Sequence, residues 1–198
     1  IHHLSKDKKL KKIIDHQDPQ KLVKRKNIGS WIIASIISQQ LSTRVADVIY
    51  QRYLDLYNGK DPDPRQILDT PPEKLRSAGL SRGKASYVQN VARFEIKEGL
   101  DPKKLNRMSN EEVISYLTQI KGVGRWTVEM LLMFALGRED VFALDDTGIQ
   151  NAMIRLYGLD NSDKKEFRKQ LLLISDRWSP YRTYACLHLW KWRDNTPK

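Results

Sequence analysis

Apolar residues recur along most of the chain at intervals of three and four, the spacing that places side chains on one face of a helix. The clearest examples are Ile32, Ile33, Ile36 and Ile37, followed by Val45, Val48, Ile49 and Leu56. A shorter lysine-rich segment carries Leu10, Ile13 and Ile14. No stretch alternates strictly between apolar and polar residues between hairpin signals, which is the pattern of a half-buried strand. The chain is therefore predicted to be all-α.

Further helices are expected over residues 83–97, 110–119, 125–136, 147–157, 163–175 and 180–192. The stretch 61–72 differs because it contains Pro62, Pro64, Pro71 and Pro72. Proline inside a helix removes a backbone hydrogen bond and clashes with the preceding turn. This stretch is therefore predicted to be a turn-rich connection.

Composition narrows the class of protein. The chain has 198 residues, of which 40% are hydrophobic and 30% charged, as expected for a soluble globular protein of one domain or two small lobes. No apolar run is long enough to cross a bilayer. The single cysteine, Cys186, excludes an internal disulfide framework, a cysteine-rich zinc site and a four-cysteine iron–sulfur cluster. Since no export leader is recognisable, we expect a reduced, intracellular protein.

The charge balance indicates a polyanionic partner. Lys and Arg number 35 against 24 Asp and Glu, which gives a formal net charge of +11. Such a surface attracts DNA or RNA in a salt-sensitive way. A basic solvated surface without a nucleic-acid partner remains the alternative. The four histidines show no metal-ligand spacing, so no metal site is expected.

A tight turn joins two predicted helices at Gly122, Val123, Gly124 and Arg125. Its two glycines permit positive φ angles and close approach of the backbone, so that amides at the start of the second helix can face an anion. A DNA phosphate would fit such a turn without any reading of sequence. A helical hairpin without a ligand can also carry two glycines, and this segment alone does not decide between the two.

Two adjacent aspartates, Asp145 and Asp146, precede the helix expected over 147–157. Aspartate before a helix is favoured as a cap, because it accepts bonds from free amides and complements the helix dipole. An ionised carboxylate at such a place can also act in catalysis. The capping and catalytic interpretations are compatible.

Four segments in this order resemble the helix-hairpin-helix DNA glycosylases, and most closely the 3-methyladenine glycosylases of the alkylation-repair branch. They are residues 37–42, 122–127, 141–149 and 177–190. The resemblance implies two helical lobes with the active site in the cleft between them. The central lobe would span 30–136 and contain the hairpin at about 110–136. The second lobe would comprise 1–29 and 137–198 and carry the catalytic aspartate.

The resemblance also implies roles for individual residues. Asp146 takes the place of the catalytic carboxylate, with Asp145 flanking it. Trp126 stands where the lyase-competent branches carry a lysine, which implies an enzyme that uses water alone. Trp126 and Trp190 would stack on the flipped base; the alternative is that they are core aromatics, an interpretation that fits Trp190 better than Trp126.

DNA contacts outside the catalytic centre follow from the same comparison. Gln40 or its neighbour Leu41 would fill the gap left by the flipped base. Lys84 and Arg125, each opening a helix after a glycine turn, would contact the DNA backbone together with the hairpin. The alternative for each of these charged side chains is an ordinary solvated position.

The function expected from this resemblance is hydrolytic excision of alkylated purines from double-stranded DNA during base excision repair. The enzyme would be a monomer without cofactor, iron–sulfur cluster or membrane partner, and a monovalent cation in the hairpin stays open. It would lie in the cytoplasm with the nucleoid, or in a nucleus. One alternative is a glycosylase of the same fold for a deaminated or oxidised base. The other is a non-catalytic DNA-binding module.

Overall fold

The computed structural model describes residues 2–18 and 21–195, and helices joined by turns and loops make up this part of the chain. None of them forms a strand, so the all-α prediction is confirmed. A short 3-10 turn, η1, spans Leu4–Lys6. The helices are α1 (Lys8–Ile14), α2 (Ile28–Ser38), α3 (Thr43–Asp55), α4 (Pro64–Asp69), α5 (Pro72–Ser77), α6 (Arg82–Glu98), α7 (Pro102–Asn106), α8 (Asn110–Leu117), α9 (Arg125–Phe134), α10 (Thr147–Tyr157), α11 (Lys164–Asp176) and α12 (Arg182–Asn195).

The chain divides into two compact units. One comprises Arg25–Leu131 and is called the hairpin unit below. The other comprises Ile1–Lys24 and Leu132–Lys198 and is called the aspartate unit. Helix α9 contributes residues to both units, whereas the sequence prediction placed the boundaries at residues 30 and 136.

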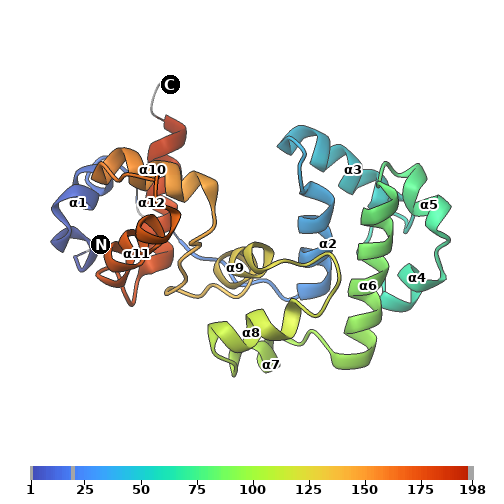
Figure 1. Ribbon diagram of the computed structural model, residues 1–198. Helices are drawn as coiled ribbons and strands as arrows, with labels where there is room; N and C mark the ends of the chain where they lie inside the picture. The colour runs from blue at the N-terminus through green and yellow to red at the C-terminus, as the bar shows by residue number, and fades with distance from the viewer. Residues whose placement is uncertain (1, 19–20, 196–198) are drawn as a thin grey trace. The chain divides into compact units, whose positions relative to one another are not determined.

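The hairpin unit is built around α2 and α6. The isoleucines that predicted α2, at positions 32, 33, 36 and 37, are all at most 2% exposed. Figure 1 shows α6 beside α2, with α4 and α5 against α6, and the contacts between these helices agree. Helix α3 also packs on α2. The core of this unit therefore supports the two helices that flank the α2–α3 turn.

The connection predicted to be turn-rich over 61–72 is in part helical. This stretch contains α4 and the start of α5, each with proline at its first position, and α7 begins in the same way. At the first helical position the missing N–H has no intrahelical acceptor to lose, and the fixed φ suits the helix. A capping box between Asp63 and Gln66 completes the start of α4.

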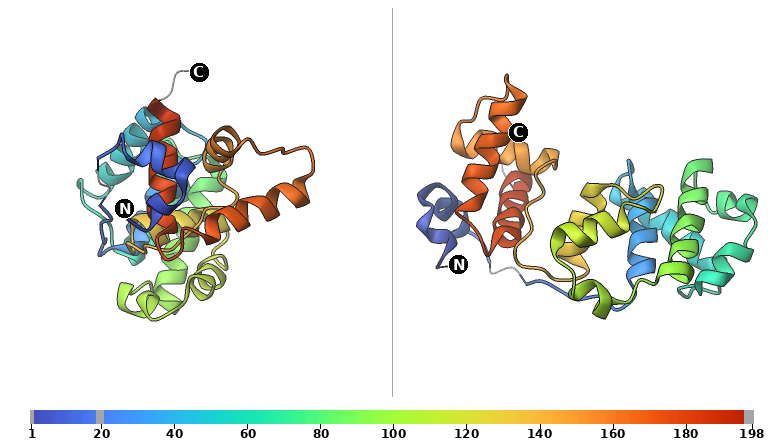
Figure 2. Two further views of the ribbon diagram at one scale, coloured as in Figure 1. Left: turned by 90° about the vertical axis from the view of Figure 1, so that its left-hand side faces the viewer. Right: turned by 60° about the horizontal axis from the view of Figure 1, so that its bottom comes forward.

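In the aspartate unit, α12 packs against α10 and α1, and the three helices lie together in Figure 2. Asp7 connects the start of α1 to other parts of this unit through hydrogen bonds. Its carboxylate caps α1 through the amides of Lys9 and Leu10. It also accepts hydrogen bonds from the hydroxyl of Tyr157 at 2.9 Å and from the indole of Trp178 at 3.2 Å.

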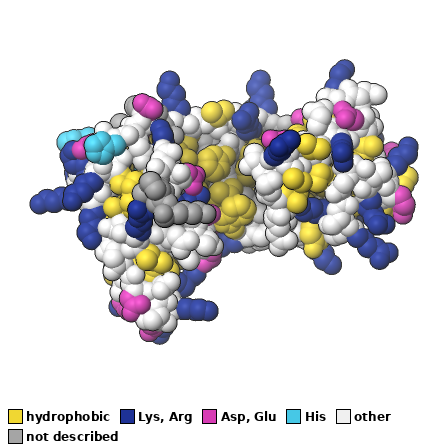
Figure 3. All heavy atoms as spheres, turned by 90° about the horizontal axis from the view of Figure 1, so that it is seen from above, with side chains coloured by type: hydrophobic (Ala, Val, Ile, Leu, Met, Phe, Trp, Pro, Cys, Tyr) yellow, Lys and Arg dark blue, Asp and Glu magenta, His cyan; other side chains and the backbone are white. Residues whose placement is uncertain are grey.

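Basic side chains are spread over the surface. Figure 3 shows lysine and arginine around much of one face, with fewer acidic side chains between them. Among the described residues, no helix has the length and apolar character needed to span a membrane.

Candidate active site

Asp146 is the residue immediately before α10, and its carboxylate accepts hydrogen bonds from α10 and from α12. Oδ1 accepts a hydrogen bond from the backbone amide of Ile149 at 2.8 Å and one from the indole Nε1 of Trp190 at 2.9 Å. The first bond is an N-cap, as the sequence predicted. The second comes from α12 and brings together two of the predicted site residues.

The loop that leads to Asp146 is fastened to the beginning of α12 by Thr183. The amide of Thr183 donates to the carbonyl of Glu139 at 2.9 Å, and its hydroxyl donates to the carbonyl of Arg138 at 2.6 Å. The same hydroxyl accepts a bond from the amide of Val141 at 3.0 Å. Because Trp190 lies two turns further along α12, this fastening sets the place of Asp146 relative to its indole donor.

An ion pair reinforces the same junction. The guanidinium of Arg182 binds the carboxylate of Asp140 through Nε at 2.7 Å and through Nη2 at 2.9 Å. Burial acts to raise the pKa of Asp140, but the hydrogen bonds from Arg182 and Ser179 outweigh it and hold this pKa below its ordinary value. Because the guanidinium contacts both oxygens of the carboxylate, the pair fixes the orientation of α12 relative to this loop.

The neighbouring aspartate lies in a different environment. Asp145 forms an ion pair with Arg168 of α11, and its side chain is 47% exposed. Asp146 is partly buried and is bonded to neutral donors from α10 and α12. The structure therefore distinguishes two residues that are chemically identical in the sequence.

The two predicted stacking residues belong to different units. Trp190, in the aspartate unit, is partly buried, and its ring lies 5.9 Å from that of Phe134 at an interplanar angle of 33°. Trp126, in the hairpin unit, is 42% exposed. An exposed indole at the first turn of α9 is unlike the core aromatic that was the alternative interpretation of this residue.

The hairpin requires glycine at only one of its two glycine positions. Gly122 has φ of +107°, and a Cβ atom there would lie 2.3 Å from Cγ of Tyr87. Gly124 does not lie in the left-handed region, and a Cβ atom there would meet nothing within 4 Å. Gly122 therefore serves the fold, whereas the space beside Gly124 is open for a ligand.

Three of the predicted backbone-binding residues, Val123, Arg125 and Lys84, have internal partners. Val123 is 5% exposed, and its amide donates to the carbonyl of Ile120 at 2.9 Å. Its side chain is thus an anchor in the core, and its amide is already used in the turn. The amides of the first turn of α9 remain the ones without an intrahelical acceptor.

The side chain of Arg125 forms ion pairs with both helices of the hairpin. Its Nη2 lies 2.6 Å from Glu111 Oε1 on α8, and its Nε lies 3.0 Å from Glu129 Oε1 on α9. Since both partners are carboxylates, the positive charge of this residue is balanced within the protein. The side chain thus has a structural role in the hairpin, and its predicted contact with a phosphate stays a prediction.

The predicted gap-filling residues lie at the tip of the turn between α2 and α3. Gln40 is exposed and has φ of +58°, and Leu41 is 37% exposed. Lys84, predicted as a backbone contact, instead directs its ammonium group at this turn. Nζ donates to the carbonyl of Ile37 at 2.8 Å and to that of Gln39 at 2.7 Å.

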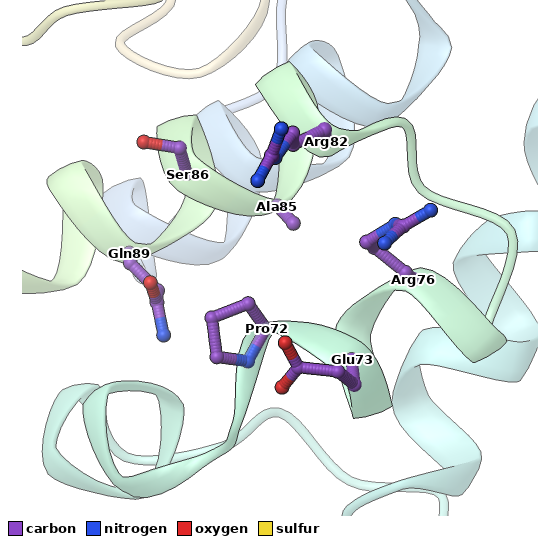
Figure 4. A pocket seen from close by; sticks show the side chains of 7 residues that line it. All are labelled: Pro72, Glu73, Arg76, Arg82, Ala85, Ser86 and Gln89. Atoms are coloured by element: carbon purple, nitrogen blue, oxygen red, sulfur yellow. The ribbon is translucent and has the colours of Figure 1, made fainter.

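The hairpin unit also contains a surface pocket of about 300 Å³. It is lined by Pro72, Glu73, Arg76, Arg82, Ala85, Ser86 and Gln89. Figure 4 shows that α5 supplies one wall and α6 the other. Neither Asp146 nor Trp190 is among these lining residues.

The hairpin and the capped aspartate lie within a segment that matches a known family. Residues 33–176 match the HhH-GPD superfamily of base excision DNA repair proteins. The chain belongs to this superfamily. The HhH-GPD chain is also 38% identical over 187 residues to DNA-3-methyladenine glycosylase 1 of Schizosaccharomyces pombe, which covers 93% of this chain and 80% of that protein.

Solved structures of HhH-GPD relatives have the same fold. The crystal structure of a DNA-3-methyladenine glycosidase from Bacillus halodurans has a TM-score of 0.85 at 36% identity, covering 98% of this chain and 88% of that one. The S. pombe glycosylase Mag1 in complex with abasic DNA has a TM-score of 0.80 at 36% identity, covering 96% and 93%. The resemblance drawn from four short segments is therefore confirmed over nearly the whole chain.

Sequence reasoning missed the residues that hold this HhH-GPD site in place. Thr183, Arg182 and Asp140 have ordinary sequence environments, and their partners lie more than forty positions away in the chain. No local spacing rule could connect them.

Among the described residues, no group of three or more His, Cys, Asp or Glu side chains could hold a metal ion.

Proposed function

We propose that this HhH-GPD protein is a monofunctional DNA glycosylase that removes alkylated purines, of the 3-methyladenine and 7-methylguanine type, from double-stranded DNA. It acts as a monomer in base excision repair, wherever the DNA of its cell lies, and uses no cofactor. The names of its relatives favour this substrate class. The observation that carries the proposal is the Asp146 carboxylate fixed by Ile149 and Trp190.

Base release requires a negative charge of this kind. As the bond between the sugar and the base breaks, positive charge develops on the sugar ring. A carboxylate held in place beforehand stabilises that charge without having to reorganise. The same group can orient or deprotonate the water that attacks the anomeric carbon. In this proposal Asp146 performs both tasks.

The target base must first leave the duplex, which costs a few kcal/mol and is easier for a damaged pair. Gln40 and Leu41 lie on an exposed turn suited to filling the gap that the base leaves. Trp190, which lies beside Asp146, supplies a ring face for the flipped base, and a methylated purine carries a positive charge that such a face attracts by about 0.5–2 kcal/mol.

DNA is held through its backbone. The open space beside Gly124 allows a phosphate to approach the amides at the start of α9. The net charge of +11 adds attraction that does not depend on sequence. Trp126 has no amine and forms no Schiff base with the sugar, so the proposed reaction ends at the abasic site.

The test is a set of duplexes, each carrying one modified base, incubated with the protein and then treated with hot alkali to cleave abasic sites. We expect cleavage at 3-methyladenine or 7-methylguanine and none in the unmodified duplex. Cleavage confined to uracil or 8-oxoguanine would favour a glycosylase for deaminated or oxidised bases. Tight binding without cleavage of any duplex would favour a non-catalytic module.

A further inference from the structure

One face of α6 supports the α2–α3 turn. Lys84 lies in the first turn of this helix, and its ammonium group donates to the carbonyls of Ile37 and Gln39 at 2.8 and 2.7 Å. Both carbonyls belong to the end of α2, where helix geometry leaves acceptors without intrahelical partners. A positive charge at a helix C-terminus also complements the helix dipole. Lys84 is thus a cap supplied to α2 by another helix.

The next turns of α6 support the hairpin. Tyr87 follows Lys84 by three positions, and its ring packs so closely on Gly122 that a Cβ atom there would clash with it. Asn90 follows Tyr87 by three positions, and its Nδ2 donates to the carbonyl of Lys121 at 3.2 Å. Residues three apart lie on the same side of a helix. A single side of α6 therefore supports both the α2–α3 turn and the hairpin.

A direct bond completes the connection. Nε2 of Gln39 donates to the carbonyl of Gly122 at 3.3 Å, so the end of α2 is linked to the hairpin as well as to α6. Immediately after it, Gln40 has a φ of +58°, a left-handed conformation that residues other than glycine rarely adopt. Such a conformation persists when surrounding contacts enforce it. Here those contacts are the ones made by Lys84 and Gln39.

We propose that Lys84 is a positioning residue that fixes the α2–α3 turn relative to the hairpin. Gln40 and Leu41 then enter the duplex at a set distance from the DNA phosphate that binds the hairpin. This inference rests on the proposed function, because it assigns Lys84 to the step in which the base is extruded. Burial lowers the pKa of the Lys84 ammonium, in agreement with an internal position.

Lys84→Met tests the inference, because it removes the ammonium group and keeps the length of the side chain. Lys84→Arg keeps donors that can reach the two carbonyls. Lys103→Met is the matched control, since Lys103 is exposed on α7 and its ammonium group makes no hydrogen bond or ion pair with the described residues. Thermal unfolding of each variant reports whether the fold is kept.

The substrates separate extrusion from chemistry. Single-turnover excision is measured on one lesion in two duplexes, one with the lesion paired and one with it opposite an abasic analogue, where no base pair has to be broken. We expect Lys84→Met to slow the paired substrate by about ten- to a hundredfold, since a displacement of about 1 Å has effects of this size. The unpaired substrate should lose much less, and Lys84→Arg should restore most of the rate.

Two results would overturn the inference. Equal losses on the paired and unpaired substrates would mean that Lys84 does not act on extrusion. A larger loss of affinity for undamaged duplex than in Lys103→Met, with a shallower salt dependence, would make Lys84 a phosphate contact.

A second variant and a second signal keep the test decisive. Gln39→Leu removes the bond to Gly122 and should give the same selective loss, even if Lys84→Met does not fold. The fluorescence of 2-aminopurine beside the target base reports extrusion without requiring excision. If the wild-type protein releases no alkylated base, the proposed function fails, while the fluorescence of wild type and variants still decides the role of Lys84.

Discussion

Trp190 donates its indole N–H to the same oxygen of Asp146 that caps α10, at 2.9 Å. The carboxylate is therefore oriented from two directions, by the Ile149 amide of its own helix and by a side chain of α12. An indole has one N–H and no charge. It can thus fix the orientation of the carboxylate without neutralising it, which is a role beyond the base stacking expected from the sequence.

Replacing Trp190 by phenylalanine separates the two roles. Trp190→Phe keeps an aromatic ring beside Phe134 and removes the donor to Asp146. A hydrogen bond to a charged group contributes about 1.5–3 kcal/mol, so we expect single-turnover excision to fall by roughly ten- to a hundredfold. Affinity for undamaged duplex should not change. If Trp190→Phe matches the wild type and only Trp190→Ala is impaired, the residue acts by stacking alone.

Asp146→Asn should abolish base release, with a loss of at least about a hundredfold, because the amide keeps the shape of the carboxylate and removes its charge. DNA binding should be retained, as measured by fluorescence anisotropy on a lesion-bearing duplex. Asp145→Asn is the matched control, since it removes an exposed ion pair with Arg168 that contributes at most about 1 kcal/mol. Loss of activity in the control alone would place the catalytic role at Asp145.

Helical periodicity located the elements well where apolar spacing is strong. The helix expected over 147–157 is α10, with the same limits. The proline-rich stretch was misread because proline was treated as a helix breaker, although Pro64 and Pro72 stand at first helical positions. Proline is unfavourable in the interior of a helix but suits its first position.

The candidate site was predictable only where its chemistry is local. Asp146 could be found because it directly precedes a helix. The internal roles of Lys84 and Arg125 could not, because their acceptors are carbonyls of α2 and carboxylates of α8 and α9. Sequence shows that a side chain is positive but not which distant acceptor the fold brings to it.

The two hairpin glycines should respond oppositely to alanine. Gly124→Ala places its methyl group in open space, so it should leave the unfolding temperature unchanged and weaken binding to damaged and undamaged duplexes equally. Gly122→Ala combines a left-handed φ with a clash against Tyr87, and should lower the free energy of unfolding by about 1–3 kcal/mol or more. Chemical unfolding and DNA titration of both variants measure the two effects. Normal DNA binding by Gly124→Ala would show that no phosphate approaches there.

The absence of a lyase step is testable by chemical trapping. Because Trp126 carries no amine, borohydride should not trap a covalent adduct between the wild-type protein and DNA that contains an abasic site. A bifunctional glycosylase run in parallel shows that the reagents work. An efficient adduct would show that another lysine attacks the sugar, and mass spectrometry of the trapped peptide would identify it.

Stability in acid should depend on Asp7. Its side chain is 8% exposed and accepts hydrogen bonds from Tyr157 and Trp178. Burial acts to raise the pKa of Asp7. The bonds from the Leu10 amide and from these two side chains, together with the nearby charge of Arg177, outweigh burial, and the net pKa lies below 3.8.

A carboxyl group whose pKa is lower in the folded state stabilises that state above its unfolded pKa, and this contribution is lost as the pH falls through the folded value. Asp7→Asn should therefore reduce the free energy of unfolding by about 1.5–3 kcal/mol at neutral pH, the amount expected for hydrogen bonds to a charged group. Below pH 3.8 the difference from wild type should shrink, since a protonated aspartate has lost the same charge. Urea unfolding at both pH values measures it, with Asp47→Asn, an exposed change on α3, as the control. A difference that stays constant with pH would mean that the asparagine disrupts packing, and that the charge of Asp7 contributes nothing.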